Sequence, residues 1–120
     1  MKPPYSLFNN TKYALNGLKV LWKNEISFRL EVLIITPLII ISLFLPLMWV
    51  EHLLLIIVLL GILISESINS SIEACVDLIT QDFHPLAKIA KDCASTAVLL
   101  SVILAILVWG VILFQWWQSL

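Results

Sequence analysis

The sequence predicts an all-α membrane protein in which an amphipathic surface helix at the N-terminus is followed by three transmembrane helices. Of its 120 residues, 61% are hydrophobic and 12% are charged, and the mean hydropathy is +1.03. Soluble domains do not reach this composition. The basic residues gather in two clusters separated by long uncharged runs, which indicates membrane spans within one domain.

The first segment, about residues 5–29, is predicted to lie on the membrane surface, because its apolar residues recur at helical spacing with polar residues between them. The apolar residues are Leu7, Phe8, Leu15, Leu18, Leu21, Trp22 and Ile26, and the polar ones include Lys12, Asn16, Lys19 and Lys23. No short apolar core follows a basic start as in a secretory signal, so we expect this segment to be retained in the mature protein.

The first span is predicted at about residues 32–50, an uncharged run that contains Pro37 and Pro46. A proline inside a membrane helix is tolerated because neighbouring groups satisfy the freed carbonyl, so we expect a kink near Pro37. Glu51 and His52 are then predicted to form a short polar turn before the second span.

The second span is predicted at about residues 53–70. Its apolar part, residues 53–64, is shorter than the roughly 20 residues that a span needs. The helix must therefore carry Glu66 and its polar neighbours at or inside the membrane edge, where ionisable groups are costly and usually functional. We expect it to end near Asp82, since Pro85 disfavours the helical conformation of the residue before it.

The third span is predicted at about residues 96–117, ending at the interfacial pair Trp116–Trp117. Basic residues precede the first span or lie between the second and third spans; they are Lys2, Lys12, Lys19, Lys23, Arg29, Lys88 and Lys91. The positive-inside rule therefore places the N-terminus and the second loop in the cytoplasm.

Several other classes of site are excluded. Cys75 and Cys93 do not form a metal-type pair, so neither a disulfide framework nor a zinc site is expected. No basic patch interleaved with aromatic residues is present, so nucleic acid is not expected as a partner. The sequence also lacks the glycine-rich phosphate-binding motifs, so a nucleotide site would need another construction.

The polar end of the second span holds the main candidates for catalytic and metal-binding residues. At 100° per residue, one face of this helix holds five polar side chains, namely Glu66, Asn69, Ser70, Glu73 and Asp77. Stacked carboxylates repel one another unless they hold a cation or share protons, and such oxygen ligands suit Mg²⁺. The alternative is that these residues only form a solvated end of the helix. This alternative stays open for Asp77 and is weaker for Glu66, because the apolar run before Glu66 is too short to cross the membrane.

Further charged residues are expected near the same cytoplasmic surface, namely Asp82, His84, Lys91 and Asp92. A lysine beside oxygen ligands suggests phosphate binding. Two alternatives stay open, because Lys91 could serve only as a positive-inside anchor and His84 as a helix cap or loop residue. Glu25 and Arg29 are four residues apart, and an ordinary ion pair would explain them.

Three sequence strings carry a resemblance to the prokaryotic diacylglycerol kinase family. They are NEISFRLE from Asn24, ESINSSIEACVDLI from Glu66 and HPLAKIAKDCASTAV from His84. The stretch from the first string to the last, residues 24–98, makes up most of the chain, and the strings come in the right order with the same three-span layout. The resemblance implies a homotrimeric kinase of the bacterial inner membrane, with active sites shared between subunits, that uses ATP and Mg²⁺ to convert diacylglycerol to phosphatidic acid.

The matching motifs also imply residue roles. Glu66 would be the general base, Asn69 would orient it, and Glu25 and Glu73 would hold Mg²⁺ on ATP. The nucleotide contacts would be Tyr13, Glu25, Glu73, Asp82, Phe83, His84, Lys91 and Asp92. The lipid substrate would contact Trp22, Phe28, Arg29, Glu31, Glu66, Ser95 and Trp109.

The chain departs from the common family pattern at Ser6, Leu30, Leu78 and Ala94. VDLIT and the string from His84 also resemble the undecaprenol kinase branch of the family, so undecaprenol is the alternative lipid. A different class of function would be a small non-enzymatic membrane carrier subunit with Glu66 as a coupling carboxylate. That alternative leaves Glu73, Lys91 and Asp92 unexplained.

Overall fold

The computed structural model describes residues 4–120 and is built from α-helices. Their bounds are α1 Leu7–Asn24, α2 Ile26–Leu43, α3 Trp49–Ile79 and α4 Pro85–Gln118. The predicted helical architecture is confirmed, and α2, α3 and α4 are each long and apolar enough to cross a membrane. Lys2, one of the basic residues counted for the orientation, lies outside the described residues.

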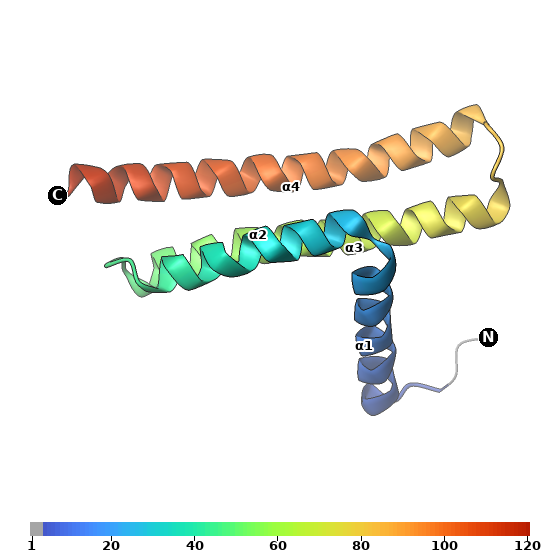
Figure 1. Cartoon of the computed structure of the whole chain (residues 1–120), viewed down its shortest axis with the longest axis horizontal. Coiled ribbons are helices and arrows are strands. Elements are labelled where there is room, and N and C mark those ends of the chain that lie inside the picture. The colour runs from blue at the N-terminus through green and yellow to red at the C-terminus, as the bar shows by residue number, and fades with distance from the viewer. Residues whose placement is uncertain (1–3) are drawn as a thin grey trace.

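The chain turns sharply between α1 and α2. Glu25 adopts an extended conformation (φ −111°, ψ 106°) that separates the two helices, and α1 lies across the direction of the other three (Figure 1). The first span therefore begins at Ile26, earlier than predicted. No residue of α1 is buried.

Arg29 closes this junction instead of pairing with Glu25. Its Nη1 atom donates hydrogen bonds to the carbonyl oxygens of Trp22 (2.8 Å) and Lys23 (2.9 Å). These carbonyls lie in the last turn of α1, where no helical amide is available to them. The alternative account, an ordinary Glu25–Arg29 ion pair, therefore does not hold, because the break in the helix gives the guanidinium a better set of acceptors.

The turn between the first and second spans lies at residues 44–48, and the predicted turn at Glu51–His52 is wrong. Pro46 lacks an amide hydrogen and cannot sit inside a continuing helix without losing a hydrogen bond. Glu51 instead lies in the first turn of α3, where its Oε1 atom accepts a hydrogen bond from the Met48 amide at 3.1 Å. A carboxylate at a helix N-terminus is stabilised by the helix dipole.

Helix α3 runs without a break for 31 residues. The prediction that the second helix continues through Glu66 is confirmed, and the helix extends beyond residue 70 to Ile79. Helix α4 begins at Pro85, where His84 caps it by accepting the Leu86 amide on Nδ1 at 3.1 Å. The adjoining ends of α3 and α4 project past the junction of α1 with α2 (Figure 1).

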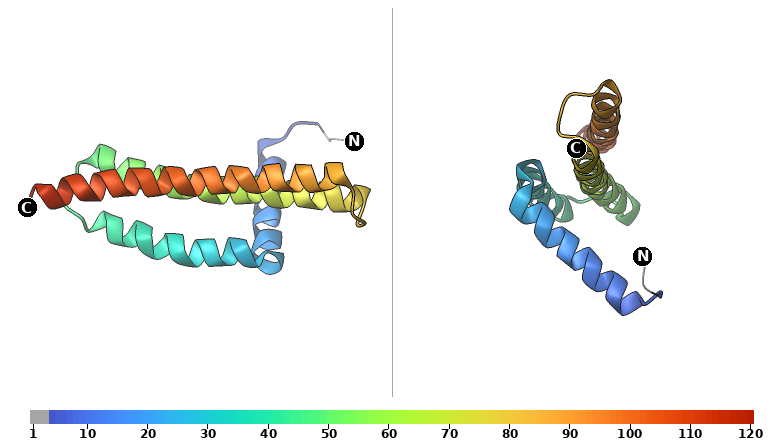
Figure 2. Two further views of the ribbon diagram at one scale, coloured as in Figure 1. Left: turned by 90° about the horizontal axis from the view of Figure 1, so that it is seen from above. Right: turned by 90° about the vertical axis from the view of Figure 1, so that its right-hand side faces the viewer.

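The core forms where α3 packs against both α2 and α4, as two further views show (Figure 2). Its buried residues are Ile35, Val58, Leu59, Ile62 and Ala105. Two polar contacts also join α3 to α4: the hydroxyls of Ser65 and Ser101 are hydrogen-bonded, and Trp109 Nε1 donates to the Leu55 carbonyl at 3.2 Å. Interhelical hydrogen bonds of this kind help to hold membrane helices together.

Candidate active site

The five polar residues of the predicted face, which we call the acidic stripe, become more exposed toward the C-terminal end of α3. Glu66, Asn69 and Ser70 are 5%, 7% and 8% exposed. Glu73 is half-buried and Asp77 is exposed. The solvated interpretation therefore fits Asp77, whereas Glu66 lies inside the protein.

Helix α2 supplies the partners of Glu66. Ser27 Oγ donates a hydrogen bond of 2.8 Å to Glu66 Oε1, and the Glu31 carboxyl group lies beside that of Glu66. Sequence reasoning missed Ser27, although its four-residue spacing from Glu31 places both on one face of α2. The two helices thus gather two carboxyl groups and a hydroxyl at one point.

Acceptor atoms without partners surround this point. Among residues 4–120, Glu31 Oε2, Asn69 Oδ1 and Ser70 Oγ are buried and make no hydrogen bond. Asn69 uses its other polar atom, Nδ2, to donate to Glu73 Oε1 at 3.3 Å. Buried polar atoms are nearly always satisfied, so these acceptors mark a place where a hydroxyl-bearing ligand can bind.

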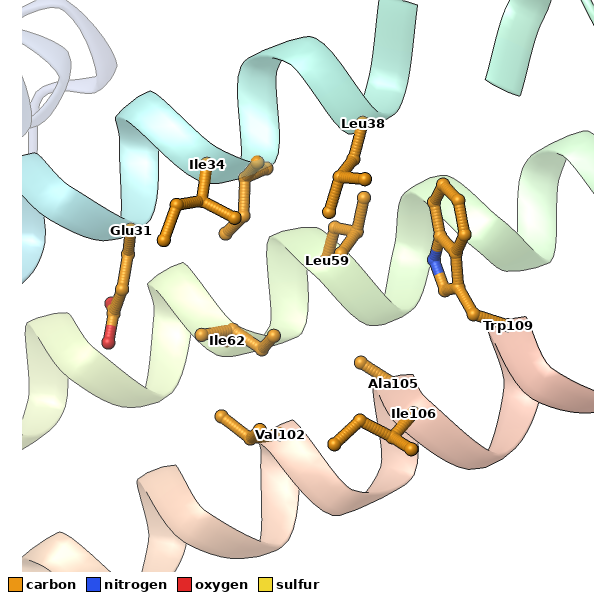
Figure 3. A pocket seen from close by; sticks show the side chains of 10 residues that line it. Glu31, Ile34, Leu38, Leu59, Ile62, Val102, Ala105, Ile106 and Trp109 are labelled. Atoms are coloured by element: carbon orange, nitrogen blue, oxygen red, sulfur yellow. The ribbon is translucent and has the colours of Figure 1, made fainter. Parts of the chain in front are cut away.

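An apolar groove of about 380 Å³ leads to this point between α2 and α4. Glu31 lies at one end of the groove and Trp109 at the other, with aliphatic side chains between them (Figure 3). The remaining lining residues are Ile34, Ile35, Leu38, Leu59, Ile62, Val102, Ala105 and Ile106. Such a groove suits an acyl chain whose polar end lies at Glu31.

A second, polar pocket of about 260 Å³ lies where the C-terminal end of α3 meets the N-terminal end of α4. Five residues of the predicted nucleotide set line it, namely Asp82, Phe83, His84, Lys91 and Asp92.

Ion pairs and electrostatics organise this pocket. Lys91 Nζ pairs with Asp77 Oδ1 at 2.7 Å, and Lys88 Nζ pairs with Asp92 Oδ2 at 2.6 Å. Lys91 also interacts electrostatically with Glu73. Lys91 therefore links the pocket to the exposed end of the acidic stripe.

Other predicted site residues lie apart within this single chain. Trp22 and Phe28 line a separate groove of about 410 Å³, to which Lys19 and Lys23 of α1 also contribute. Tyr13 is exposed on α1, and Ser95 is exposed on α4. One chain therefore does not bring the whole predicted set together.

The carboxylates also suit a magnesium ion held together with a nucleotide. No group of three His, Cys, Asp or Glu side chains poised to bind a metal occurs in the part of the chain that the structure describes. Magnesium in nucleotide sites is commonly held by one or two carboxylates together with substrate phosphates. Glu73 beside Asn69, and Glu25, whose side chain makes no capping hydrogen bond, fit that mode.

Known proteins resemble this chain over most of its length. The model of the prokaryotic diacylglycerol kinase family matches residues 12–113. The chain is 40% identical to a diacylglycerol kinase of Haemophilus influenzae over 108 residues, which is 90% of this chain and 92% of the relative. It is 41% identical to one of Helicobacter pylori over 104 residues, 87% of this chain and 81% of the relative. It is also 36% identical to one of Escherichia coli over 103 residues, 86% of this chain and 84% of the relative. With the family model matched over most of its length, the chain belongs to the prokaryotic diacylglycerol kinase family.

Proposed function

We propose that this chain transfers the γ-phosphoryl group of ATP to the free hydroxyl of diacylglycerol and so makes phosphatidic acid at the cytoplasmic face of the bacterial inner membrane. The observation that carries the proposal is the position of Glu66. This buried carboxylate lies beside Glu31, which lines the polar end of an acyl-sized groove. Asn69 and Glu73, which are hydrogen-bonded to each other, follow it on the same face of α3 toward the charged pocket.

Depth in the membrane favours this assignment. Trp49 and Glu66 are separated by about 26 Å of helix at 1.5 Å per residue, which is close to the roughly 30 Å of a hydrocarbon core. The bond to Ser27 also sets Glu66 level with the start of α2, where α1 branches off (Figure 1). With α1 on the membrane surface, Glu66 lies at the depth of a glycerol headgroup, whose acyl chains extend along the groove.

In the proposed reaction, Glu66 accepts the proton of the lipid hydroxyl as that oxygen attacks the γ-phosphorus, and ADP leaves. Little proton transfer is needed before the loose phosphoryl transition state forms, so good positioning is more important than a strong base. Asn69 bonds Glu73 and lies one turn from Glu66, so it fixes the distance between the proton-accepting and phosphate-binding parts of the site.

The cytoplasmic part of the site binds the nucleotide in this proposal. Lys91 neutralises phosphate oxygens, while Asp82, Phe83, His84 and Asp92 line the pocket beside it. Glu25 and Glu73 would hold Mg²⁺, which when bound offsets the charge of the ATP phosphates. Tyr13 of α1 adds a further nucleotide contact.

We also propose a homotrimer whose active sites are shared between subunits, with the N-terminus in the cytoplasm. Two features support the shared site: Tyr13 and Ser95 are exposed on α1 and α4 of the single chain, and large apolar side chains cover the outward faces of α2 and α4. A neighbouring subunit would bring residues of another surface helix to the groove and pocket.

A phosphate-transfer assay tests the function. The purified protein in detergent micelles receives γ-labelled ATP, Mg²⁺ and one lipid, either diacylglycerol, undecaprenol or triacylglycerol, which has no free hydroxyl. We expect label in phosphatidic acid and none with triacylglycerol. Preferential labelling of undecaprenol would move the lipid assignment to the other branch of the family. Absence of label in every lipid would contradict the proposed kinase activity and favour the alternative of a non-enzymatic membrane carrier subunit.

A further inference from the structure

Ser27 differs from several other hydroxyl residues of the helices because its side chain bonds a carboxylate of another helix. Thr11, Ser67 and Ser101 each donate to the carbonyl oxygen four residues earlier in their own helix, at 2.9, 2.8 and 2.9 Å. This back-bonding is common for a helical serine or threonine. Ser27 instead donates across to α3, to the Glu66 carboxylate.

The helix junction explains why Ser27 is free to do so. The carbonyl four residues before Ser27 belongs to Lys23, and Arg29 Nη1 already donates to it at 2.9 Å. Glu25 has separated the two helices, so Ser27 lies in the first turn of α2. Its hydroxyl therefore points to the neighbouring helix, and it places the Glu66 carboxylate beside the N-terminal end of α2, where the helix dipole favours a negative charge.

We infer that Ser27 is a positioning residue that holds the Glu66 carboxylate in the orientation needed for proton transfer. This inference rests on the proposed function. Ser27 occupies one carboxylate oxygen, Oε1, and in the proposed reaction the other oxygen, Oε2, accepts the proton of the lipid hydroxyl. A glutamate side chain has three rotatable bonds, and the hydrogen bond from Ser27 to Oε1 restricts them. The Glu31 carboxyl group also lies beside Glu66 but is itself a carboxyl group, so Ser27 is the hydroxyl donor. Hydrogen bonds to charged groups are among the stronger ones in proteins.

The first test is kinetic. In Ser27→Ala we expect kcat to fall about tenfold, the effect of losing one hydrogen bond to a charged group, while the KM values for ATP and lipid change less than about twofold. Ser27→Thr retains the hydroxyl and should restore most of kcat. Ser67→Ala is the matched control, because it removes a hydroxyl next to Glu66 in sequence that bonds the Leu63 carbonyl instead, and its kcat should stay near the wild-type value.

The second test does not depend on turnover. The infrared difference spectrum between wild type and Glu66→Gln identifies the carboxyl band of Glu66, and the same difference in the Ser27→Ala background should show that band shifted. An unshifted band, or a kcat of Ser27→Ala equal to that of Ser67→Ala, would overturn the positioning role. If the wild-type protein labels no lipid, the proposed function fails by itself, and the infrared band still reports whether Ser27 holds Glu66.

Discussion

Glu66 and Asp77 lie on the same face of α3 but in opposite surroundings. Glu66 is 5% exposed and accepts a hydrogen bond from Ser27 of α2, whereas Asp77 is exposed and pairs with Lys91 of α4. The difference arises because α2 begins at Ile26, level with Glu66, so it does not cover the C-terminal end of α3 (Figure 1). A shared helix face thus determines which residues align, and the neighbouring helix determines the chemistry of each.

Removing the buried carboxylate should have the largest effect. Glu66→Gln keeps the size and the acceptor for Ser27 but cannot take a proton, so we expect phosphorylation of diacylglycerol to fall by about 10²–10⁴-fold. The measurement is turnover with labelled ATP at saturating lipid. Size-exclusion chromatography of the same variant should show unchanged assembly, and near-normal turnover would contradict the role of Glu66 as the base.

Replacing Glu73, which is half-buried midway along the acidic stripe, should have an intermediate effect on activity. The effect should arise from weaker Mg²⁺ binding and not from the loss of the base. Glu73→Gln removes a charge that would hold Mg²⁺, so we expect about a tenfold or larger rise in the Mg²⁺ concentration needed for half-maximal activity. A magnesium titration at fixed ATP measures this. Titration curves that superimpose with those of the wild type would refute the metal assignment, whereas a pure loss of kcat would place Glu73 with Glu66.

Asp77 at the exposed end should show the smallest effect. Exposed ion pairs contribute about 1 kcal/mol or less, so Asp77→Asn should change the thermal stability little and lower activity less than about fivefold, with the difference shrinking at high salt. Lys91→Met breaks the same pair and also removes the proposed phosphate contact. It should therefore raise the KM for ATP more than Asp77→Asn does. An equal loss of activity in Asp77→Asn and Glu66→Gln would contradict the different roles assigned to the two ends of the acidic stripe.

The sequence predicted the helical class, the three spans and the passage of α3 through Glu66, because these depend on hydrophobic length and helical periodicity. The predicted position of the first turn was wrong, because a glutamate after an apolar run fits a polar loop. A carboxylate also stabilises the N-terminus of a helix, and Glu51 does so by accepting a hydrogen bond from the Met48 amide. The ordinary ion pair that the sequence left open for Arg29 and Glu25 does not form, because spacing along one helix does not indicate that the helix is broken between α1 and α2.

The sequence by itself therefore determined that an acidic residue must lie at the membrane edge, since an apolar run shorter than the bilayer forces the following residues into it. Only the tertiary structure decided which groups meet that residue. Ser27 and Glu66 are 39 residues apart, and their contact depends on where α2 begins and how it packs against α3. Periodicity describes one helix at a time, whereas the hydrogen bonds of a site form between helices.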